Sequence, residues 1–149
     1  MRSRTQRIGL AALIALLALA GCIPQMPGAS QPPPVQPPLA GTSWNLEAYG
    51  APGNLTDAIA GRDATIQFTG EELTGQASCN AYFGQYKSKP DGTLIITGLG
   101  NTEMYCAEAG VMDQEQAFLD ALREATSYEV VDGTLRISGG GVLLVLSRA

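Results

Sequence analysis

The sequence predicts an α+β domain that is mostly β, with seven or eight short strands and one amphipathic helix. Short segments in which apolar and polar side chains alternate recur through the C-terminal two thirds of the chain, separated by turns containing glycine, asparagine or proline. One stretch around residue 115 instead repeats its apolar side chains at helical spacing. The helix precedes the last hairpin, so strands are expected both before and after it along the sequence.

The N-terminal half of the domain is expected to begin with three strands. Residues 43–49 alternate, and a loop rich in glycine, proline and asparagine is expected up to residue 61. Residues 64–68 alternate again. Residues 73–79 follow a turn, and their register places Cys79 on the face toward the core.

The stretch 75–86 departs most from average composition. Asn80 is expected to form the corner of a hairpin, because asparagine tolerates left-handed backbone conformations. Tyr82, Gly84 and Tyr86 then share one face of the next strand, where the glycine would let a neighbouring group approach closely. We expect the tyrosines to pack in the core or at its rim; a stacking platform for a ligand is the alternative.

The remaining strands are expected around the helix. They comprise residues 93–97, 128–131, 135–138 and 142–146, the last of these continuously apolar and therefore expected to be covered on both faces. Residues 98–109 are expected to be irregular.

The helix is defined by an apolar stripe. Its members are Val111, Phe118, Leu122 and Ala125, with Leu119 beside them. Asp113 and Gln116 have the spacing of a capping box, which would start the regular helix at Asp113; a start one turn earlier is the alternative.

Glu115 is a carboxylate on this stripe and needs a hydrogen-bond partner or a place at the edge of the buried face. We expect it to be buried and bonded to the segment 98–106, around Thr102. A catalytic role is disfavoured, because no partner acid, base or metal is evident in the sequence.

The first residues read as an export signal. Residues 1–21 combine three arginines with a polar-free run at 8–20 that is short for a membrane span. The run ends in Leu-Ala-Gly before Cys22, which resembles a bacterial lipobox and would make Cys22 the lipidated (for example palmitoylated) N-terminus. An ordinary secretory signal with an incidental cysteine is the alternative. Since Ile23 is not aspartate, the resemblance implies the outer membrane in a cell with two membranes.

Residues 22–40 are expected to form a lipid-anchored, proline-rich linker. Seven of the nine prolines lie there and no charge does. Such chain favours extended polyproline II and forms no packed core of its own. Residues 41–149 remain for one domain.

Composition excludes several function classes. Without the three leader arginines, six basic side chains face fourteen acidic ones, a formal net charge of −8, which argues against nucleic acid and anionic lipid as partners. The absence of histidine removes the commonest general base and metal ligand, so we predict no catalytic residue, no metal and no cofactor.

Cys79 and Cys106 are the only thiols left if Cys22 is lipidated, and an exported protein lies in an oxidising compartment. We therefore expect a disulfide between them, worth on the order of 3–4 kcal/mol through restriction of the unfolded chain. Two buried free cysteines are the alternative.

Together these residues resemble a META domain, the family that includes the HslJ lipoproteins. The resemblance covers nearly all of residues 41–149 and rests on Trp44, Leu46, Gly75, Cys79, Asn80, Tyr82, Gly84, Tyr86, Thr102, Met104, Cys106, Met112, Glu115, Phe118 and Leu122. The family often has arginine and alanine where this chain has Glu103 and Tyr105. The resemblance implies an antiparallel, barrel-like sheet with one helix packed on it, no enzymatic activity, and an association with envelope stress.

The leading hypothesis is a non-catalytic cell-envelope lipoprotein that binds a partner, anchored to the membrane through Cys22. It would lie on the outer membrane facing the periplasm if there are two membranes, and otherwise on the outer face of the cell membrane. One alternative is a carrier of a small apolar ligand in the mouth of the barrel. Another is an inhibitor of an exported hydrolase, acting through a protruding loop such as residues 98–105.

Overall fold

The structure is a computed structural model that describes residues 34–149. The expected signal, Cys22 and most of the expected linker lie outside the described residues, so lipidation remains a prediction. In the described part of the chain, no helix is both long and apolar enough to cross a membrane.

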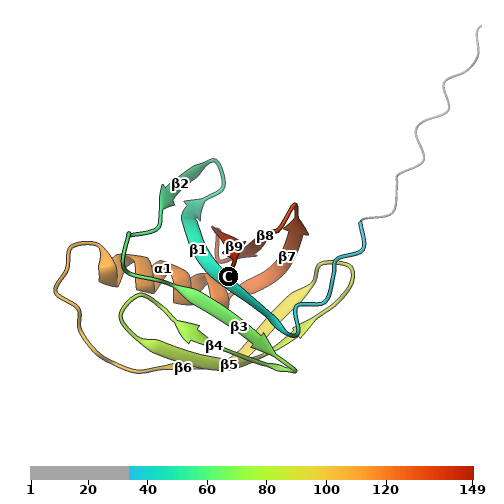
Figure 1. Cartoon of the computed structure of the whole chain (residues 1–149), viewed down its shortest axis with the longest axis horizontal. Coiled ribbons are helices and arrows are strands. Elements are labelled where there is room, and N and C mark those ends of the chain that lie inside the picture. Colours follow the sequence, from blue (N-terminus) through green and yellow to red (C-terminus); the bar gives the residue numbers. More distant parts are fainter. Residues whose placement is uncertain (1–33) are drawn as a thin grey trace, which may run out of the picture. The chain divides into compact units, whose positions relative to one another are not determined.

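Nine strands and one helix make up residues 34–149 (Figure 1). They are β1 (Thr42–Ala51), β2 (Asn54–Asp57), β3 (Thr65–Thr69), β4 (Glu72–Gln76), β5 (Ala81–Ser88), β6 (Leu94–Asn101), α1 (Val111–Arg123), β7 (Ala125–Val131), β8 (Thr134–Gly139) and β9 (Val142–Arg148).

Eight strands form one antiparallel sheet in the order β6-β5-β4-β3-β1-β9-β8-β7, and β2 pairs with β1 alone. The sheet curls into a half-barrel with α1 packed on it (Figure 1), so the expected barrel-like fold is confirmed. Its two edges approach at one end, where Thr93 bridges Ser127 and the Tyr128 N–H donates to the Gly92 carbonyl at 2.7 Å.

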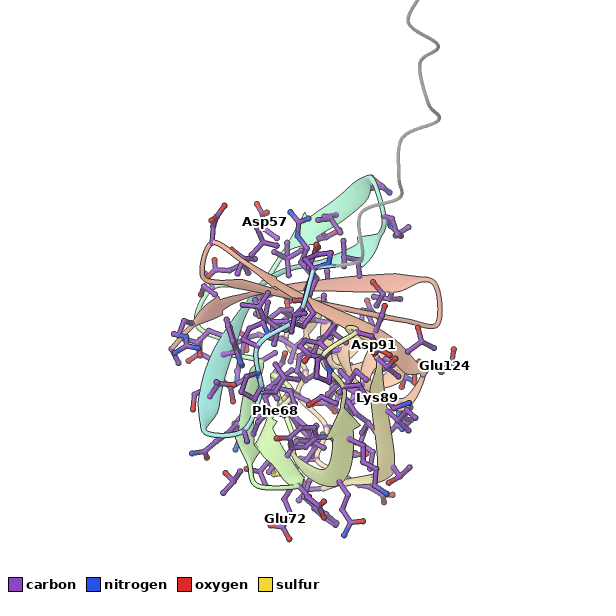
Figure 2. The ribbon with its side chains drawn as sticks, turned by 90° about the vertical axis from the view of Figure 1, so that its right-hand side faces the viewer. Asp57, Phe68, Glu72, Lys89, Asp91 and Glu124 are labelled. Carbon is purple, nitrogen blue, oxygen red and sulfur yellow. A yellow bond between two sulfur atoms is a disulfide. The ribbon has the colours of Figure 1, made fainter. Side chains whose placement is uncertain are left out.

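The curled sheet encloses a packed core. Phe68 meets Tyr86 edge-on at a centroid distance of 4.7 Å, and Tyr82 meets Phe118 of α1 at 5.7 Å. Figure 2 shows Phe68 inside the molecule and the labelled carboxylates Asp57 and Glu72 at its periphery. The inner face of the sheet is thus filled by aromatic and aliphatic side chains, which disfavours a ligand carried in the barrel mouth.

Two glycines of the motif stretch are explained by close packing. A Cβ on Gly75 would lie 2.0 Å from the Thr65 carbonyl oxygen and 2.9 Å from the Tyr82 hydroxyl. A Cβ on Gly84 would press on side chains of Leu73 and Leu99 at 3.3 and 3.1 Å. Gly75 therefore makes room for the hydrogen bond from the Tyr82 hydroxyl to Thr65, at 2.7 Å.

Residues 34–40, assigned above to the linker, instead lie against the domain, and we call them the strap. Leu39 is 1% exposed and belongs to the core. The Gln36 N–H donates to the Pro90 carbonyl, and its side-chain oxygen accepts from the Val130 N–H, both at 2.7 Å. A proline-rich segment can pack in this way because extended chain leaves its polar groups available to a neighbouring strand.

Four local expectations were wrong. Residues 98–101, expected to be irregular, belong to strand β6. The loop up to residue 61 contains β2, which carries no alternation signal because all four residues are exposed. The left-handed residue at the hairpin corner is Ser78, with φ 85°, and not Asn80. The helix begins at Val111 after Gly110, with no side-chain cap, so the earlier start was the right alternative.

The last strand was predicted in part. Leu144 and Leu146 of β9 are fully buried, whereas Val142, Leu143 and Val145 are half-buried. One face of β9 is thus in the core and the other is only partly covered.

Candidate loop-presenting site

Glu115 lies at the centre of a buried polar network. It is 4% exposed, on the first turns of α1. One carboxylate oxygen, Oε2, accepts from the main-chain N–H groups of Cys79 and Asn80, at 3.0 and 2.7 Å. The other oxygen, Oε1, accepts from the Asn80 side-chain amide at 2.7 Å. The helix is thereby fixed to the β4–β5 corner.

Asn80 connects this corner to the loop of residues 102–106. Its Oδ1 accepts from the Thr102 hydroxyl and from the Met104 N–H, both at 2.7 Å. Its Nδ2 donates to the Met104 carbonyl at 2.9 Å as well as to Glu115. Asn80 is 1% exposed, so these bonds replace water at every polar atom of its side chain.

The expected partner of Glu115 was therefore wrong, although its burial was predicted correctly. The carboxylate bonds to Cys79 and Asn80 and not directly to residues 98–106. The side-chain amide of Asn80 lies between the two, because it offers a donor to the carboxylate and an acceptor to the loop at the same time.

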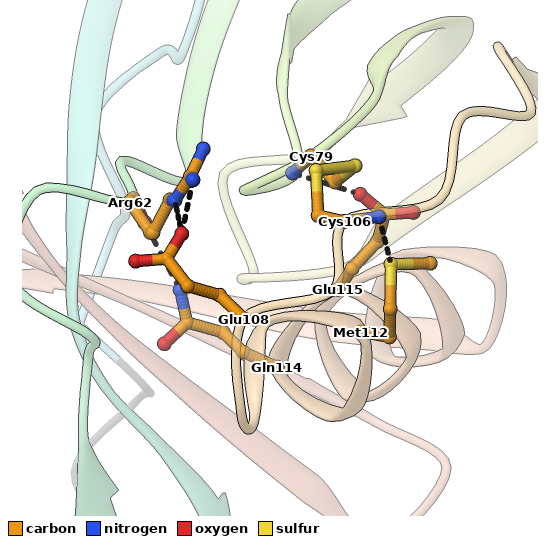
Figure 3. A network of polar contacts seen from close by, with 7 residues as sticks. All are labelled: Arg62, Cys79, Cys106, Glu108, Met112, Gln114 and Glu115. Atoms are coloured by element: carbon orange, nitrogen blue, oxygen red, sulfur yellow. Dashed lines mark hydrogen bonds and ion pairs between the residues drawn. A yellow bond between two sulfur atoms is a disulfide. The ribbon is translucent and has the colours of Figure 1, made fainter.

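A disulfide joins Cys79 to Cys106, with their Cα atoms 6.0 Å apart. It ties the corner to the far end of the same loop (Figure 3). The Cys106 N–H points to the sulfur of Met112 at 3.5 Å (Figure 3). The loop is thus held at Thr102, Met104 and Cys106.

Gln114 is a second buried polar residue, which the sequence reasoning missed. It is fully buried; its Oε1 accepts from the Ile59 N–H at 2.7 Å, and its Nε2 donates to the Ser78 hydroxyl at 2.7 Å. Nε2 also donates to the carbonyl of Arg62, whose side chain pairs with Glu108 (Figure 3). The signal was present: position 114 falls three residues after Val111 and four before Phe118, on the same buried stripe.

Three consecutive side chains of the loop are exposed, even though the main chain of Met104 is fixed by Asn80. Met104 is 59% and Tyr105 81% exposed, and Glu103 is exposed between Thr102 and Met104. We call Glu103, Met104 and Tyr105 the loop face. The loop face combines an aromatic ring, a thioether and a carboxylate. The main chain of its central residue, Met104, is bonded to the Asn80 side chain.

A surface hollow of about 440 Å³ lies by the strap and another of about 280 Å³ lies beside the loop face. The second is bordered by Met112, Glu115, Leu119 and Arg123 of α1. Arg123 is held by Asp120 at 3.0 Å and by the Asn101 side chain at 3.1 Å.

The other motif residues lie apart from the loop. Tyr82 and Tyr86 are buried in the core, as the packing interpretation expects, with Gly75 and Gly84 beside them. Burial raises the pKa of Tyr82 far above its ordinary value. These residues build the sheet that positions Asn80.

The network fixes the loop of residues 102–106 and leaves the loop face exposed. Among the residues that the structure describes, no group of three or more histidine, cysteine, aspartate or glutamate side chains is arranged to hold a metal. Every buried side-chain nitrogen and oxygen in residues 34–149 has a hydrogen-bond partner.

Comparisons with known proteins place the fold. The family model of the META domain matches residues 37–149. An NMR structure of a protein from Burkholderia xenovorans has a TM-score of 0.64 and 27% identity, covering 85% of this chain and 99% of that one. A second protein solved by NMR has a TM-score of 0.56 at 20% identity, covering 71% and 87% of the two chains.

A crystal structure of a DUF4847 family protein from Bacteroides vulgatus has a TM-score of 0.53 at 14% identity, covering 73% of this chain and 93% of that one. The last two likenesses, at 20% and 14% identity, show the fold alone. A search of curated proteins finds no match.

Proposed function

The chain belongs to the META-domain family, and from this premise we propose that it is a non-catalytic lipoprotein of the cell envelope that presents its loop face to a protein partner. The META domain is not a known enzyme family. The proposal has two parts, anchoring through Cys22 and recognition through residues 103–105.

Anchoring is supported by the sequence. A charged start, an apolar run and small residues before Cys22 are the arrangement of a lipoprotein signal, and the proline-rich stretch after it suits a spacer. With Ile23 after the cysteine, we place the protein on the outer membrane, facing the periplasm, in a cell with two membranes.

Recognition is supported by one observation above all. The loop face is exposed while the main chain of its central residue, Met104, is bonded on both sides by Asn80. A loop that is already ordered loses little conformational entropy when a partner binds, so exposed side chains on it are suited to recognition. An unsupported loop with the same side chains would lose part of its affinity in ordering.

The position of the loop within the domain fits the same function. The strap and residues 102–110 lie at opposite ends of the long axis of the domain (Figure 1). A chain tethered through its N-terminal side would therefore hold the loop face on the side away from the strap, where a partner can approach it.

One alternative from the sequence is a special case of this proposal. If the partner is an exported hydrolase, presentation of the loop would amount to inhibition. The carrier alternative is less well supported, since the inner face of the sheet is filled by the core.

The anchoring part is tested by Cys22→Ser. We expect the variant to fold but to leave the membrane fraction, because stable anchoring needs more than the marginal affinity of a single acyl chain. Sedimentation of the variant with membranes at high salt would contradict the proposal.

The recognition part is tested by a photoreactive benzoylphenylalanine placed at Tyr105 in cells that make the protein. We expect discrete protein adducts after illumination. The same probe at Phe83, which is 62% exposed on β5, is the matched control and should give none of these adducts. Identical adducts at both positions would mean that the loop face is no recognition surface.

A further inference from the structure

The loop face has an electrostatic character that narrows the kind of partner. Glu103 forms no ion pair in the described part of the chain, where the two ion pairs are Arg62 with Glu108 and Arg123 with Asp120. Arg123, the arginine that borders the hollow, is therefore already paired with a carboxylate. The carboxylate of Glu103 is the uncompensated charge beside Met104 and Tyr105.

The hollow next to the loop face adds a second carboxylate. Glu115 borders it, and its Oε1 receives one donor, the Asn80 amide, whereas Oε2 receives two. A carboxylate offers about four acceptor positions, so one position of Oε1 remains. A basic group that enters the hollow would meet the carboxylates of Glu103 and Glu115, which both line it.

Resting on the proposed function, we infer that the loop face and its hollow receive a basic side chain of a partner protein, with an apolar residue of the partner packing on Tyr105 and Met104. A guanidinium suits the site because it pairs with carboxylates and also lies against aromatic rings. The net charge of −8 on the part of the chain after the leader would steer such a partner toward the domain.

The same charges disfavour other occupants. An anionic lipid surface would be repelled by Glu103 and by the net charge. A second copy of this chain, docked symmetrically, would bring its own Glu103 against this one. A basic protein surface is the occupant whose charge complements the site.

The probe is a pair of blocked pentapeptides, Gly-Leu-Arg-Phe-Gly and the same peptide with citrulline in place of arginine. They are titrated into the isotope-labelled Cys22→Ser protein and followed by amide NMR. We expect the arginine peptide to shift the amides of residues 102–106 and those of α1 that border the hollow. The citrulline peptide, equal in shape but uncharged, should bind about fivefold more weakly.

Two charge reversals make the test specific. Glu103→Lys should weaken the binding of the arginine peptide by about fivefold or more. Glu129→Lys, at an exposed position on β7, should change the affinity of this peptide little. Equal binding of both peptides, or shifts confined to other parts of the sheet, would overturn the inference. In that case adducts from position 105 in cells would still support the proposed function, so the two failures are distinguishable.

Discussion

The side-chain amide of Asn80 pairs with both main-chain polar groups of Met104, accepting from its N–H at 2.7 Å and donating to its carbonyl at 2.9 Å. An amide side chain here performs the role that a neighbouring strand performs in a sheet. It does so for one residue of an irregular loop, and Glu115 holds the amide in place from the other side.

Asn80→Ala should destabilise the protein by about 2–3 kcal/mol, because Glu115 Oε1, the main-chain N–H of Met104 and the Thr102 hydroxyl each lose their bond to the amide. Asn80→Asp should cost more at neutral pH, since it removes the donor and puts a second carboxylate beside Glu115. Urea unfolding with the disulfide intact measures both. Asn54→Ala on exposed β2 is the control, and equal midpoints for it and Asn80→Ala would contradict the assignment.

Glu115→Ala should cost about 1–3 kcal/mol, because three buried donors lose their acceptor. Glu115→Gln keeps one acceptor oxygen and the shape of the side chain, so it should cost less. The midpoints of thermal unfolding, measured with the disulfide intact, show which of the two variants is less stable. Glu72→Gln, at an exposed position of β4, should leave the midpoint unchanged. Wild-type midpoints in both Glu115 variants would mean that the network does not stabilise the fold.

Gly75→Ala should be among the most damaging small substitutions, with a loss of roughly 3 kcal/mol or more. Its Cβ would lie 2.0 Å from the Thr65 carbonyl oxygen, so β3 and β4 must separate or the Tyr82 hydrogen bond must break. Thr74→Ala, the exposed neighbour on the other face of β4, is the control. The soluble yield and the urea midpoint of both variants measure the effect. A Gly75→Ala protein as stable as this control would refute the close approach of Gly75 to the Thr65 carbonyl.

Tyr82 should make the protein sensitive to alkali. Its pKa is raised by burial, so the folded state keeps the hydroxyl proton while the unfolded chain loses it near the ordinary pKa of 10.0. The contribution of the Tyr82 hydroxyl to the free energy of unfolding is complete below pH 10. Above pH 10 the free energy of unfolding falls, with a slope that approaches about 1.4 kcal/mol per pH unit. Tyr82→Phe should flatten this part of the pH profile, measured by urea unfolding between pH 8 and about pH 11.

Tyr82→Phe should also cost about 1 kcal/mol at neutral pH through the lost bond to Thr65. Tyr105→Phe, which alters an exposed ring, serves as control for the profile. An unchanged alkaline slope in Tyr82→Phe would show that another group governs it.

Much of the fold could be predicted because its signals are local. Alternation placed β1, β3, β5 and β8 to within a few residues, and the helical stripe placed α1. What could not be predicted depends on contacts between distant segments. β2 is fully exposed and pairs only with β1, so its sequence carries no core signal.

The candidate site divides in the same way. A buried carboxylate on an apolar stripe could be recognised as Glu115, and cysteine counting predicted the disulfide. That Asn80 would mediate between Glu115 and the loop depends on three segments meeting, which no single-segment pattern encodes. Ser78 takes the left-handed conformation at this corner, and the Asn80 side chain bonds to Glu115 instead.

The strap should determine the order in which parts of the domain detach when the chain is pulled from its N-terminal side. A pull on the chain from its N-terminal side reaches the domain at Gln36, whose bonds to Pro90 and Val130 lie where the edges of the sheet approach each other. These two bonds and the burial of Leu39 are loaded before any strand ladder, so the strap should peel first and release about 20 Å of chain. Optical-tweezers traces should show this short step ahead of unfolding, at lower force in Gln36→Ala; a single unfolding event would contradict it. Detachment of the strap would then lengthen the chain under force while the sheet and helix of the domain stay folded.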